Sequence, residues 1–339
     1  MGDARFVSLG GVWLDDIQIG GQTVHRQVLG GSVTFATLGA RLFSPTDPSS
    51  IRFVIRAGND FPSETIWKLR RWKTSLVVEW IEDLPAARGV LQYDEHDASR
   101  TTYHRLTSPL LSTHHNLTLS DVVGASCFHF FSTPETVKEE IDSISDIRAR
   151  HGLSGDLIAI WEPQAKSCSP RTLSPHLETA KIVDVFSPNH VELESFFSYA
   201  KRSSFDESRV EAQASHFLES GVGWEGAGCI VVRAAEHGCL VMSRKIGAVW
   251  LPAVIPAESP KVVDATGAGN AFLGGFAMGL LESGDFVVAA KYGQVAASFA
   301  IEQVGVPEVT GHGEDELWNG ESVMERLNSY SHALRNRRS

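Results

Sequence analysis

The sequence predicts an α/β protein in which helices cover both faces of one mostly parallel sheet. Short apolar, β-rich runs recur along the chain, helical stretches separate them, and the runs are apolar almost throughout rather than at alternate positions. Such runs are typical of strands that are buried on both faces. The 339 residues are enough for one large α/β domain, and we expect a single domain over 1–339.

Seven runs are predicted to be strands, and the stretches between them supply helices. The strands are Arg5–Leu9, Ile51–Ala57, Ser75–Trp80, Asp121–Phe130, Asp156–Glu162, Lys181–Ser187 and Gly228–Ala234, and the helices include Pro134–Arg150 and His190–Lys201. A further strand is expected to end at Val263, ahead of an apolar helix that begins near Ala268. The final residues, about 330–339, contain the basic run RNRRS and predict a short solvated tail.

Two polar segments, about 11–28 and 89–110, interrupt this alternation. Both carry Thr and Tyr residues and alternate in the manner of exposed antiparallel strands. They are compatible with separate surface hairpins, or with one small β sheet that acts as a lid over an active site. We favour the lid, which we expect either to close over a substrate or to pair with a second copy of the chain in a homodimer, because exposed strand edges tend to be covered.

Composition narrows the classes of function. The net charge is −11, with 30 Lys and Arg against 41 Asp and Glu, and a scattered acidic surface disfavours nucleic-acid partners. No apolar run approaches the length that spans a membrane, and the N-terminus carries no basic-then-apolar leader. The four cysteines show no C-x-x-C spacing, as is common for buried thiols in a reducing compartment. We therefore expect a cytoplasmic protein.

The stretch VVDATGAGNAFLGG, from Val262 to Gly275, carries the strongest chemical signal. Gly267 and Gly269 allow a sharp turn in which successive N–H groups converge at the start of a helix. These donors and the helix dipole together favour an anion, such as a transferring phosphoryl group. An ordinary glycine-rich turn into a helix is the simpler interpretation of so short a pattern.

Over its full length this stretch resembles the C-terminal signature of the ribokinase-like (pfkB) carbohydrate kinase family, Asp-x-Thr-Gly-Ala-Gly-Asp followed by Gly-Gly. The resemblance implies a three-layer α/β/α sandwich with a small β lid. It also implies ATP and Mg²⁺ as cofactors and a small-molecule acceptor with a hydroxyl group. Gly267, Ala268 and Gly269 would form the anion hole, and Asn270 occupies the position of the family's catalytic Asp.

Motifs elsewhere agree with this family and extend the resemblance over nearly the whole chain. On the acceptor side, LGGVWLDDI, LGGSVTFATLGARLF and AGNDFP resemble family elements that imply roles in substrate binding for Asp15, Gly30, Gly31 and Asp60. Trp13 and Phe35 stand where ribokinases carry Asn. These two aromatic residues either favour a ring-bearing acceptor such as a nucleoside or pack into the hinge of the lid.

On the nucleotide side, SPNHVELESFF resembles the family's N-x-x-E element, which organises magnesium through water. VVRAAEHGCLV resembles the strand-turn-strand beside the nucleotide, with Arg233 beginning a replacement of the usual Thr-Leu-Gly, and GQVAASFAIEQVG resembles the helix beside the adenine. The resemblance implies cofactor-binding roles for Asn189, Glu192, Thr266, Gly238, Gln294 and Ala297, and an indirect magnesium role for Glu192 and Asp264.

Several details, among them GARLFSP and GNAFLGG, are closest to a fungal, maintenance-of-killer-like branch of the family with Asn at the position of Asn270. An amide cannot accept the proton of an acceptor hydroxyl, and loss of a general base slows a reaction by roughly 10²–10⁴-fold. Two functions remain open: a kinase for a sugar-like or nucleoside-like hydroxyl, with Asp264 or water as a substitute base, and a pseudokinase that binds ligand as a scaffold or assembly factor. For the slow kinase, Asn270→Asp is expected to raise turnover.

Overall fold

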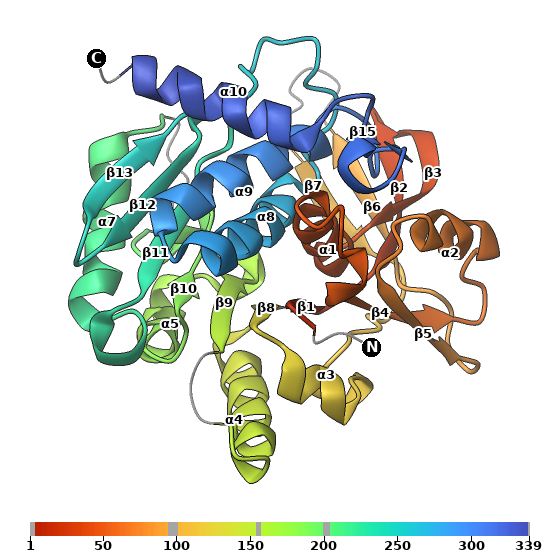
Figure 1. Ribbon diagram of the computed structural model, residues 1–339, viewed down its shortest axis with the longest axis horizontal. Coiled ribbons are helices and arrows are strands. Elements are labelled where there is room, and N and C mark those ends of the chain that lie inside the picture. The colour runs from red at the N-terminus through yellow and green to blue at the C-terminus, as the bar shows by residue number, and fades with distance from the viewer. Residues whose placement is uncertain (1–3, 94–100, 154–156, 199–203, 338–339) are drawn as a thin grey trace.

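The computed structural model describes residues 4–93, 101–153, 157–198 and 204–337. A nine-stranded sheet in the order β13-β12-β11-β10-β9-β8-β1-β4-β5 forms its centre (Figure 1). The seven strands from β11 to β5 are parallel, and β12 and β13 add antiparallel to one edge. The strands are β1 Phe6–Leu9, β4 Ile51–Gly58, β5 Ser75–Ile81, β8 Cys127–Ser132, β9 Ile158–Pro163, β10 Val185–Phe186, β11 Cys229–Arg233, β12 Cys239–Ser243 and β13 Gly247–Leu251.

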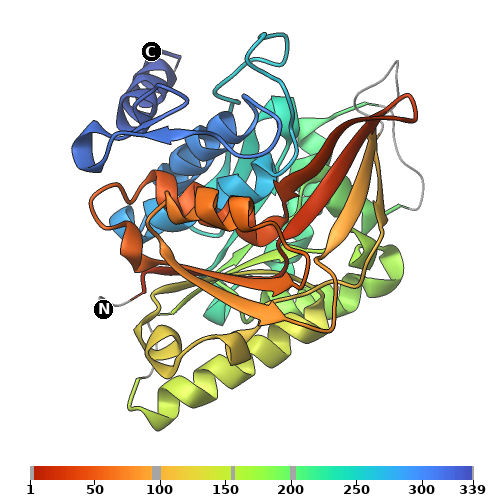
Figure 2. The same ribbon diagram turned by 90° about the vertical axis from the view of Figure 1, so that its right-hand side faces the viewer.

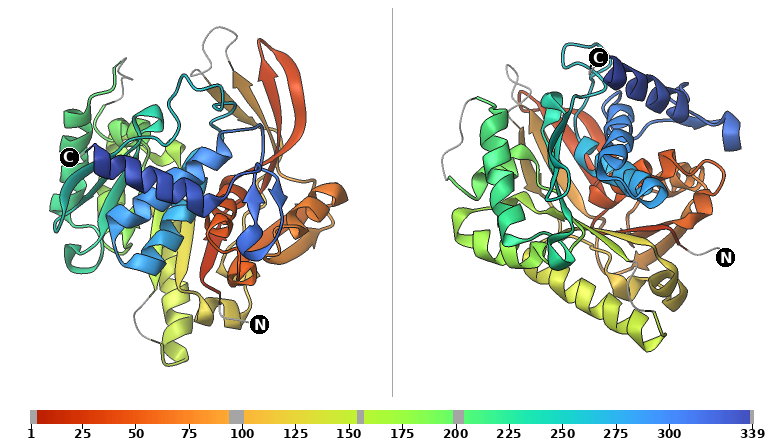
Figure 3. Two further views of the ribbon diagram at one scale, coloured as in Figure 1. Left: turned by 45° about the horizontal axis from the view of Figure 1, so that its top comes forward. Right: turned by 60° about the vertical axis from the view of Figure 1, so that its left-hand side comes forward.

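Helices cover both faces of this sheet, and each face has its own apolar core (Figure 3). The first face carries α1 Ser32–Leu42, α2 Ser63–Arg70, α8 Ala268–Ser283, α9 Phe286–Ala300 and α10 Val323–Asn336. The second carries α3 Leu119–Gly124, α4 Pro134–Arg150, α5 Leu173–Ala180, α6 His190–Ser195 and α7 Glu207–Ser220. The predicted parallel sheet with helices on both faces is confirmed. In the part of the chain that the structure describes, no helix combines the length and the apolar character needed to cross a membrane.

A second, four-stranded sheet stands up from the first at one end of the molecule (Figure 2). It contains β2 Trp13–Ile19, β3 Gln22–Gly30, β6 Arg88–Tyr93 and β7 Thr101–Arg105, in the order β3-β2-β6-β7. The two polar segments therefore form one small sheet rather than separate hairpins. The two hairpins are antiparallel, as expected, and they join through β2 and β6, which pair in parallel.

The remaining short elements connect these layers. They are β14 Val309–Thr310, β15 Leu317–Trp318 and the single 3₁₀ turns Pro48–Ser50, His114–Asn116, Ala165–Ser167, Pro170–Thr172, Trp224–Gly226, Ala235–His237 and Gly313–Asp315. The C-terminal helix α10 continues to Asn336, so the residues expected as a solvated tail from position 330 are mostly helical. Tyr330 explains the difference, because its ring is buried in the first core and its hydroxyl donates to the Pro252 carbonyl at 2.5 Å.

Three predicted elements differ from the structure. Residues 121–124 are helical rather than extended, because Thr118 caps α3 by accepting a hydrogen bond from the Asp121 N–H; the strand begins only at Cys127. The helix predicted over 190–201 ends at Ser195, and residues 199–203 lie outside the described chain. No strand precedes the glycine loop; instead the N–H groups of Val263 and Asp264 donate to the Ile301 carbonyl at the end of α9.

Candidate active site

The glycine loop lies at the carboxyl ends of the parallel strands, where α/β proteins bind ligands. Gly267 caps α8 in the left-handed conformation, with φ of 79°, and a side chain there would run into the ring of Phe35. The first-turn N–H groups of Gly269 and Asn270 have no partner within a helix and face this edge. The N–H of Ala268, expected to join them, donates to the Ala265 carbonyl at 3.2 Å.

Asn270 belongs to a buried polar cluster at the ends of β8, β9 and β11. Its side-chain nitrogen donates to Oε2 of Glu162 at 2.6 Å, and Oε1 of Glu162 pairs with Nη1 of Arg233 at 2.7 Å. His129 Nε2 lies 3.2 Å from the same Oε2, and its Nδ1 lies 2.9 Å from the hydroxyl of Ser8. Burial by itself would raise the pKa of Glu162, but Arg233, His129 and Asn270 together hold that pKa below its ordinary value. Glu162 is therefore a carboxylate, not a carboxylic acid, at neutral pH.

Asn189 and Glu192 form the N-terminal cap of α6. Oδ1 of Asn189 accepts from the Glu192 N–H at 2.8 Å, and Oε2 of Glu192 accepts from the Asn189 N–H at 2.8 Å. The same Oε2 lies 3.5 Å from Nη2 of Arg233. Burial raises the pKa of Glu192 to about 7; Arg233 opposes this rise and the charge of Glu162 adds to it.

A cavity of about 440 Å³ adjoins the loop and this cluster. The sequence-predicted residues Asn189, Gly238, Ala268, Gly269, Gln294 and Ala297 all line it, together with Arg233. Its other walls are mainly apolar, from Val254, Ile255, Val262, Phe272 and Ile301. A mostly apolar cavity with a few polar groups in its lining is typical of a site for a small organic molecule.

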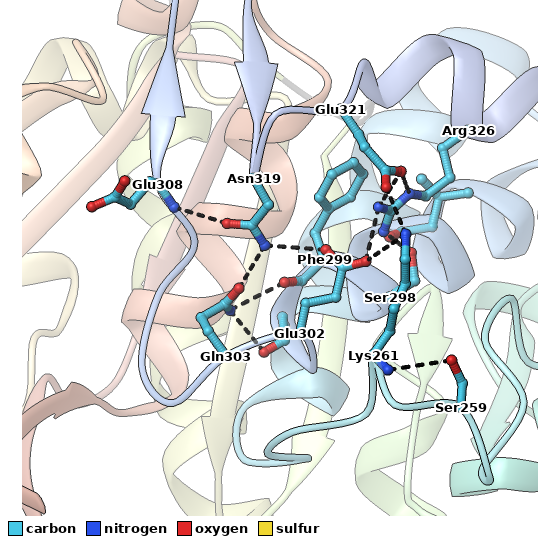
Figure 4. A network of polar contacts seen from close by, with 12 residues as sticks. Ser259, Lys261, Ser298, Phe299, Glu302, Gln303, Glu308, Asn319, Glu321 and Arg326 are labelled. Atoms are coloured by element: carbon cyan, nitrogen blue, oxygen red, sulfur yellow. Dashed lines mark hydrogen bonds and ion pairs between the residues drawn. The ribbon is translucent and has the colours of Figure 1, made fainter.

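The C-terminal part of the chain holds one wall of this cavity in place (Figure 4). Arg326 of α10 donates to Ser298, which lines the cavity, at 3.0 Å and to Glu302 at 2.9 Å. Lys261, in the loop before the glycines, pairs with Glu321 at 2.6 Å, and Glu321 also accepts from Arg326 at 2.5 Å. The network thus ties the end of α9 and the loop before α8 to the start of α10.

On the other side of the loop lies a much smaller cavity, of about 10 Å³. Asp15, Gly30, Phe35, Asp264 and Thr266 line it, as do Ile17, Val28, Leu29, Leu91 and Gly305. Thr266 was expected on the nucleotide side, and the structure places it here. The small sheet closes this space.

Two tyrosines connect the small sheet to these residues. The hydroxyl of Tyr93, at the end of β6, donates to Oδ1 of Asp264 at 2.8 Å and lies 2.9 Å from the hydroxyl of Thr266. The hydroxyl of Tyr103, on β7, donates to Oδ1 of Asp15 at 2.9 Å. Burial raises the pKa of Asp15 to about 6, although the bond from Tyr103 lowers it.

The remaining predicted acceptor residues lie around the base of the small sheet. Trp13 does not line the small cavity; it packs edge-on against Tyr103 and beneath the guanidinium of Arg105. Gly31, with φ of 98°, begins α1 so close to Gly11 and Trp13 that a side chain would not fit. Asp60 accepts from the Ala86 N–H at 2.6 Å and from Arg88 at 2.9 Å, which anchors the start of β6 and puts Asp60 outside both cavities.

Sequence reasoning gave no role to four residues of the site: Glu162, Arg233, His129 and Tyr93. Glu162 ends a predicted apolar strand, and a carboxylate at the carboxyl end of a parallel strand is a usable signal, because these ends converge on the ligand crevice. Arg233 was visible as a departure from the family pattern. His129 and Tyr93 could not be found, because only the pairing of β8 with β9 and the closure of the small sheet bring them to the loop.

The fold defines an α/β protein of the ribokinase-like class. The model of the pfkB family carbohydrate kinases matches residues 131–310, more than half of the chain. The chain therefore belongs to the pfkB family.

Two fungal relatives match almost the full length. The chain is 29% identical to an uncharacterized protein of Schizosaccharomyces pombe, with 97% of this chain and 93% of that protein covered. It is 26% identical to protein MAK32 of Saccharomyces cerevisiae, with 94% and 89% covered. Among solved structures, Arabidopsis thaliana ribokinase complexed with ribose and ATP matches with a TM-score of 0.64 and 17% identity, covering 96% of this chain and 99% of that one. The structural match supports the ribokinase-like fold.

Proposed function

We propose that this protein binds ATP in the 440 Å³ cavity and transfers its γ-phosphoryl group to a hydroxyl of a sugar-like or nucleoside-like small molecule. One observation carries the proposal. Neighbouring residues of the glycine loop line two different cavities: Ala265, Ala268 and Gly269 line the large one, and Asp264 and Thr266 line the small one. A phosphoryl group held at the start of α8 would thus lie between a donor and an acceptor.

The large cavity suits the nucleotide. Gly238, Gln294 and Ala297 line it together with apolar side chains suited to an adenine ring, and Gly269 and Arg233 line it side by side at the start of α8. Anions are stabilised at a helix N-terminus by unpaired N–H groups and by the helix dipole. The triphosphate would therefore point toward Gly269 and Asn270.

The small cavity suits an acceptor only after the small sheet moves. About 10 Å³ does not hold a sugar, so we propose that the segments 11–28 and 89–110 open as a lid on the single ribokinase-like domain formed by the whole chain. Opening would release Asp264 and Thr266 from Tyr93 and expose Asp15 to bind acceptor hydroxyls. The two outer strands of the lid, β3 and β7, are sheet edges, which supports a homodimer through this sheet.

Transfer at this site would be slow. The acceptor oxygen forms a bond to the γ-phosphorus, the bond to the bridging oxygen of ADP breaks, and the hydroxyl proton passes to the transferred phosphoryl group. Because Asn270 cannot take that proton, the rate falls by roughly 10²–10⁴-fold relative to a site with a general base. Phosphoryl transfer tolerates such a loss because positioning and electrostatics supply most of its catalysis.

A ligand-binding scaffold is the second candidate, and a specific contact favours it. The amide of Asn270 is engaged by Glu162 at 2.6 Å, and Phe35 and Tyr93 fill the acceptor side. Such a pseudokinase would bind ATP and change the position of the small sheet without turnover. Both functions suit a cytoplasmic protein, since its four cysteines are buried free thiols that persist in a reducing compartment.

Two measurements on the purified chain test the proposal. Calorimetry measures ATP affinity, and mass spectrometry measures phosphorylated products from a panel of sugars, polyols and nucleosides. Ala297→Trp, which fills the large cavity, should abolish both signals, whereas Met324→Trp on the exposed side of α10 should change neither. Binding with a phosphorylated product supports the kinase, and binding without any product supports the scaffold. Absence of ATP binding by the wild-type protein would refute both.

A further inference from the structure

Arg233 lies between the two buried carboxylates of the site. Its Nη1 is 2.7 Å from Oε1 of Glu162 and its Nη2 is 3.5 Å from Oε2 of Glu192. The Ser187 carbonyl accepts from Nη2 at 2.9 Å and fixes the guanidinium in this position. Arg233 also contacts the glycine loop. Its Nη1 lies so close to Gly269 that a side chain at that position would run into it. A protein cation therefore stands at the junction of the loop and the acidic residues.

The residues that the family resemblance assigns to magnesium do not fit that ion in this chain. Asn189 and Glu192 each use a side-chain oxygen to accept the other's N–H at 2.8 Å. Oδ1 of Asp264 accepts from Tyr93 at 2.8 Å and from the Thr266 N–H at 2.9 Å.

Charge reinforces this conclusion. Magnesium is held by one or two carboxylates, by its waters and by the phosphates of the nucleotide. The guanidinium fixed between the two carboxylates offsets one of their charges and repels a second cation at short range. Glu162 and Glu192 therefore gain little by attracting magnesium while Arg233 is in place.

Arg233 also lines the large cavity, although its side chain is only 10% exposed. Its Nη1 lies beside Gly269, which lines the same cavity at the start of α8. A phosphate oxygen is a strong acceptor for such a group, since arginine binds phosphate through charge-assisted hydrogen bonds.

We propose that Arg233 takes the place of magnesium in this site: with the N-terminus of α8 it binds the phosphates of ATP, so that nucleotide affinity does not depend on the metal. This proposal rests on the proposed nucleotide binding at the same loop. It adds that the permanent cation of the site is a residue of the chain.

The test is the affinity for ATP of the full chain, measured by calorimetry in excess magnesium chloride and again in excess EDTA. The wild-type dissociation constants should agree within about threefold. Arg233→Thr should weaken binding in EDTA by at least about tenfold, because it removes a charge-assisted contact, and should make binding magnesium-dependent. Arg52→Thr is the matched control: it removes another largely buried arginine, paired with Asp121 at the opposite end of the sheet, and it should leave the ratio unchanged.

The outcomes separate this proposal from the proposed function. Wild-type binding that magnesium strengthens by tenfold or more would overturn the role of Arg233 and leave nucleotide binding standing. No ATP binding under either condition would overturn both. Circular dichroism checks that Arg233→Thr is folded. If Arg233→Thr is not folded, the test uses the wild-type affinities with and without magnesium, together with Arg233→Lys. Lysine keeps the charge, so this variant should bind ATP independently of magnesium but with reduced affinity.

Discussion

The side-chain nitrogen of Asn270 donates a hydrogen bond to Oε2 of Glu162 at 2.6 Å. This contact accounts for an amide at residue 270, where the family resemblance predicts a catalytic Asp. A carboxylate at residue 270 would face the carboxylate of Glu162, whereas an amide supplies it with a donor. Asn270 is therefore part of a matched pair, and substitution of Asn270 alone does not recreate the family's site.

The first prediction revises what the sequence alone suggests for Asn270→Asp. Two carboxylates this close share one proton, and because Arg233 and His129 hold the pKa of Glu162 low, that proton stays on residue 270, which then cannot act as a base. The single variant should show no more than about a threefold gain in ATP turnover. Asn270→Asp combined with Glu162→Gln removes the repulsion and should gain at least about tenfold, the lower range for a general base.

Coupled assays of ADP release measure both variants, and Glu162→Gln alone serves as the control that should show no gain. A tenfold gain from Asn270→Asp alone would mean that Glu162 does not restrain residue 270. No gain from the double variant would mean that residue 270 does not face the acceptor.

The second prediction concerns the bond that holds the small sheet against the glycine loop. Tyr93→Phe removes the hydroxyl that joins β6 to Asp264 and Thr266. We expect a loss of about 0.5–1.5 kcal/mol in the free energy of unfolding and faster hydrogen exchange of the β6 amides. Tyr292→Phe, which removes a bond to Glu282 between α8 and α9, should leave β6 exchange unchanged. Equal β6 protection in both variants would argue against this tether.

The third prediction follows from the raised pKa of Asp15. Its pKa rises from 3.8 to about 6 on folding, so the folded protein binds the proton more tightly between these values. The free energy of unfolding therefore falls as pH rises from about 4 to about 6, by up to about 3 kcal/mol from this group. Asp15→Asn should match the wild type near pH 4 and exceed it in stability at pH 7, measured by urea unfolding.

Asp60→Asn should change the pH dependence of stability in the opposite direction to Asp15→Asn. The Ala86 N–H and Arg88 lower the pKa of Asp60, so its ionised form stabilises the folded protein above the ordinary pKa and this contribution is lost as pH falls. The Asp60 variant should thus be less stable than the wild type at pH 7 and approach it in acid. If the difference in the free energy of unfolding between Asp15→Asn and the wild type did not change with pH, the raised pKa of Asp15 would be contradicted.

The fourth prediction concerns Phe35, which is 1% exposed and fills the space between Gly267 and the small cavity. Phe35→Ala should cost about 3–5 kcal/mol of stability and enlarge the acceptor cavity. A nucleoside such as adenosine should then raise the melting temperature of the variant more than that of the wild type. Phe53→Ala, an equally buried substitution in β4, should lose similar stability without this response to ligand. Equal responses would mean that Phe35 does not control access.

The local sequence determined the layers of the fold and the glycine loop. Continuous apolar runs predicted the parallel strands, and Pro134 with Thr133 before it started α4 at the predicted residue, because a Pro in the first turn and a side-chain cap are local signals. The glycines of the loop were equally legible, since the left-handed conformation of Gly267 excludes most other residues. The expected strand at Asp121 failed because an apolar run by itself does not separate a short capped helix from a strand.

Only the tertiary structure decided the chemistry around that loop. Glu162, Arg233 and Asn270 come from β9, β11 and α8, and their mutual distances depend on strand order and on where each strand ends. Tyr93 reaches Asp264 across 171 positions of sequence because the small sheet folds over the loop. Hydrogen bonds and ion pairs act over a few ångströms, so residues that the chain keeps far apart acquire these roles only when packing brings them together.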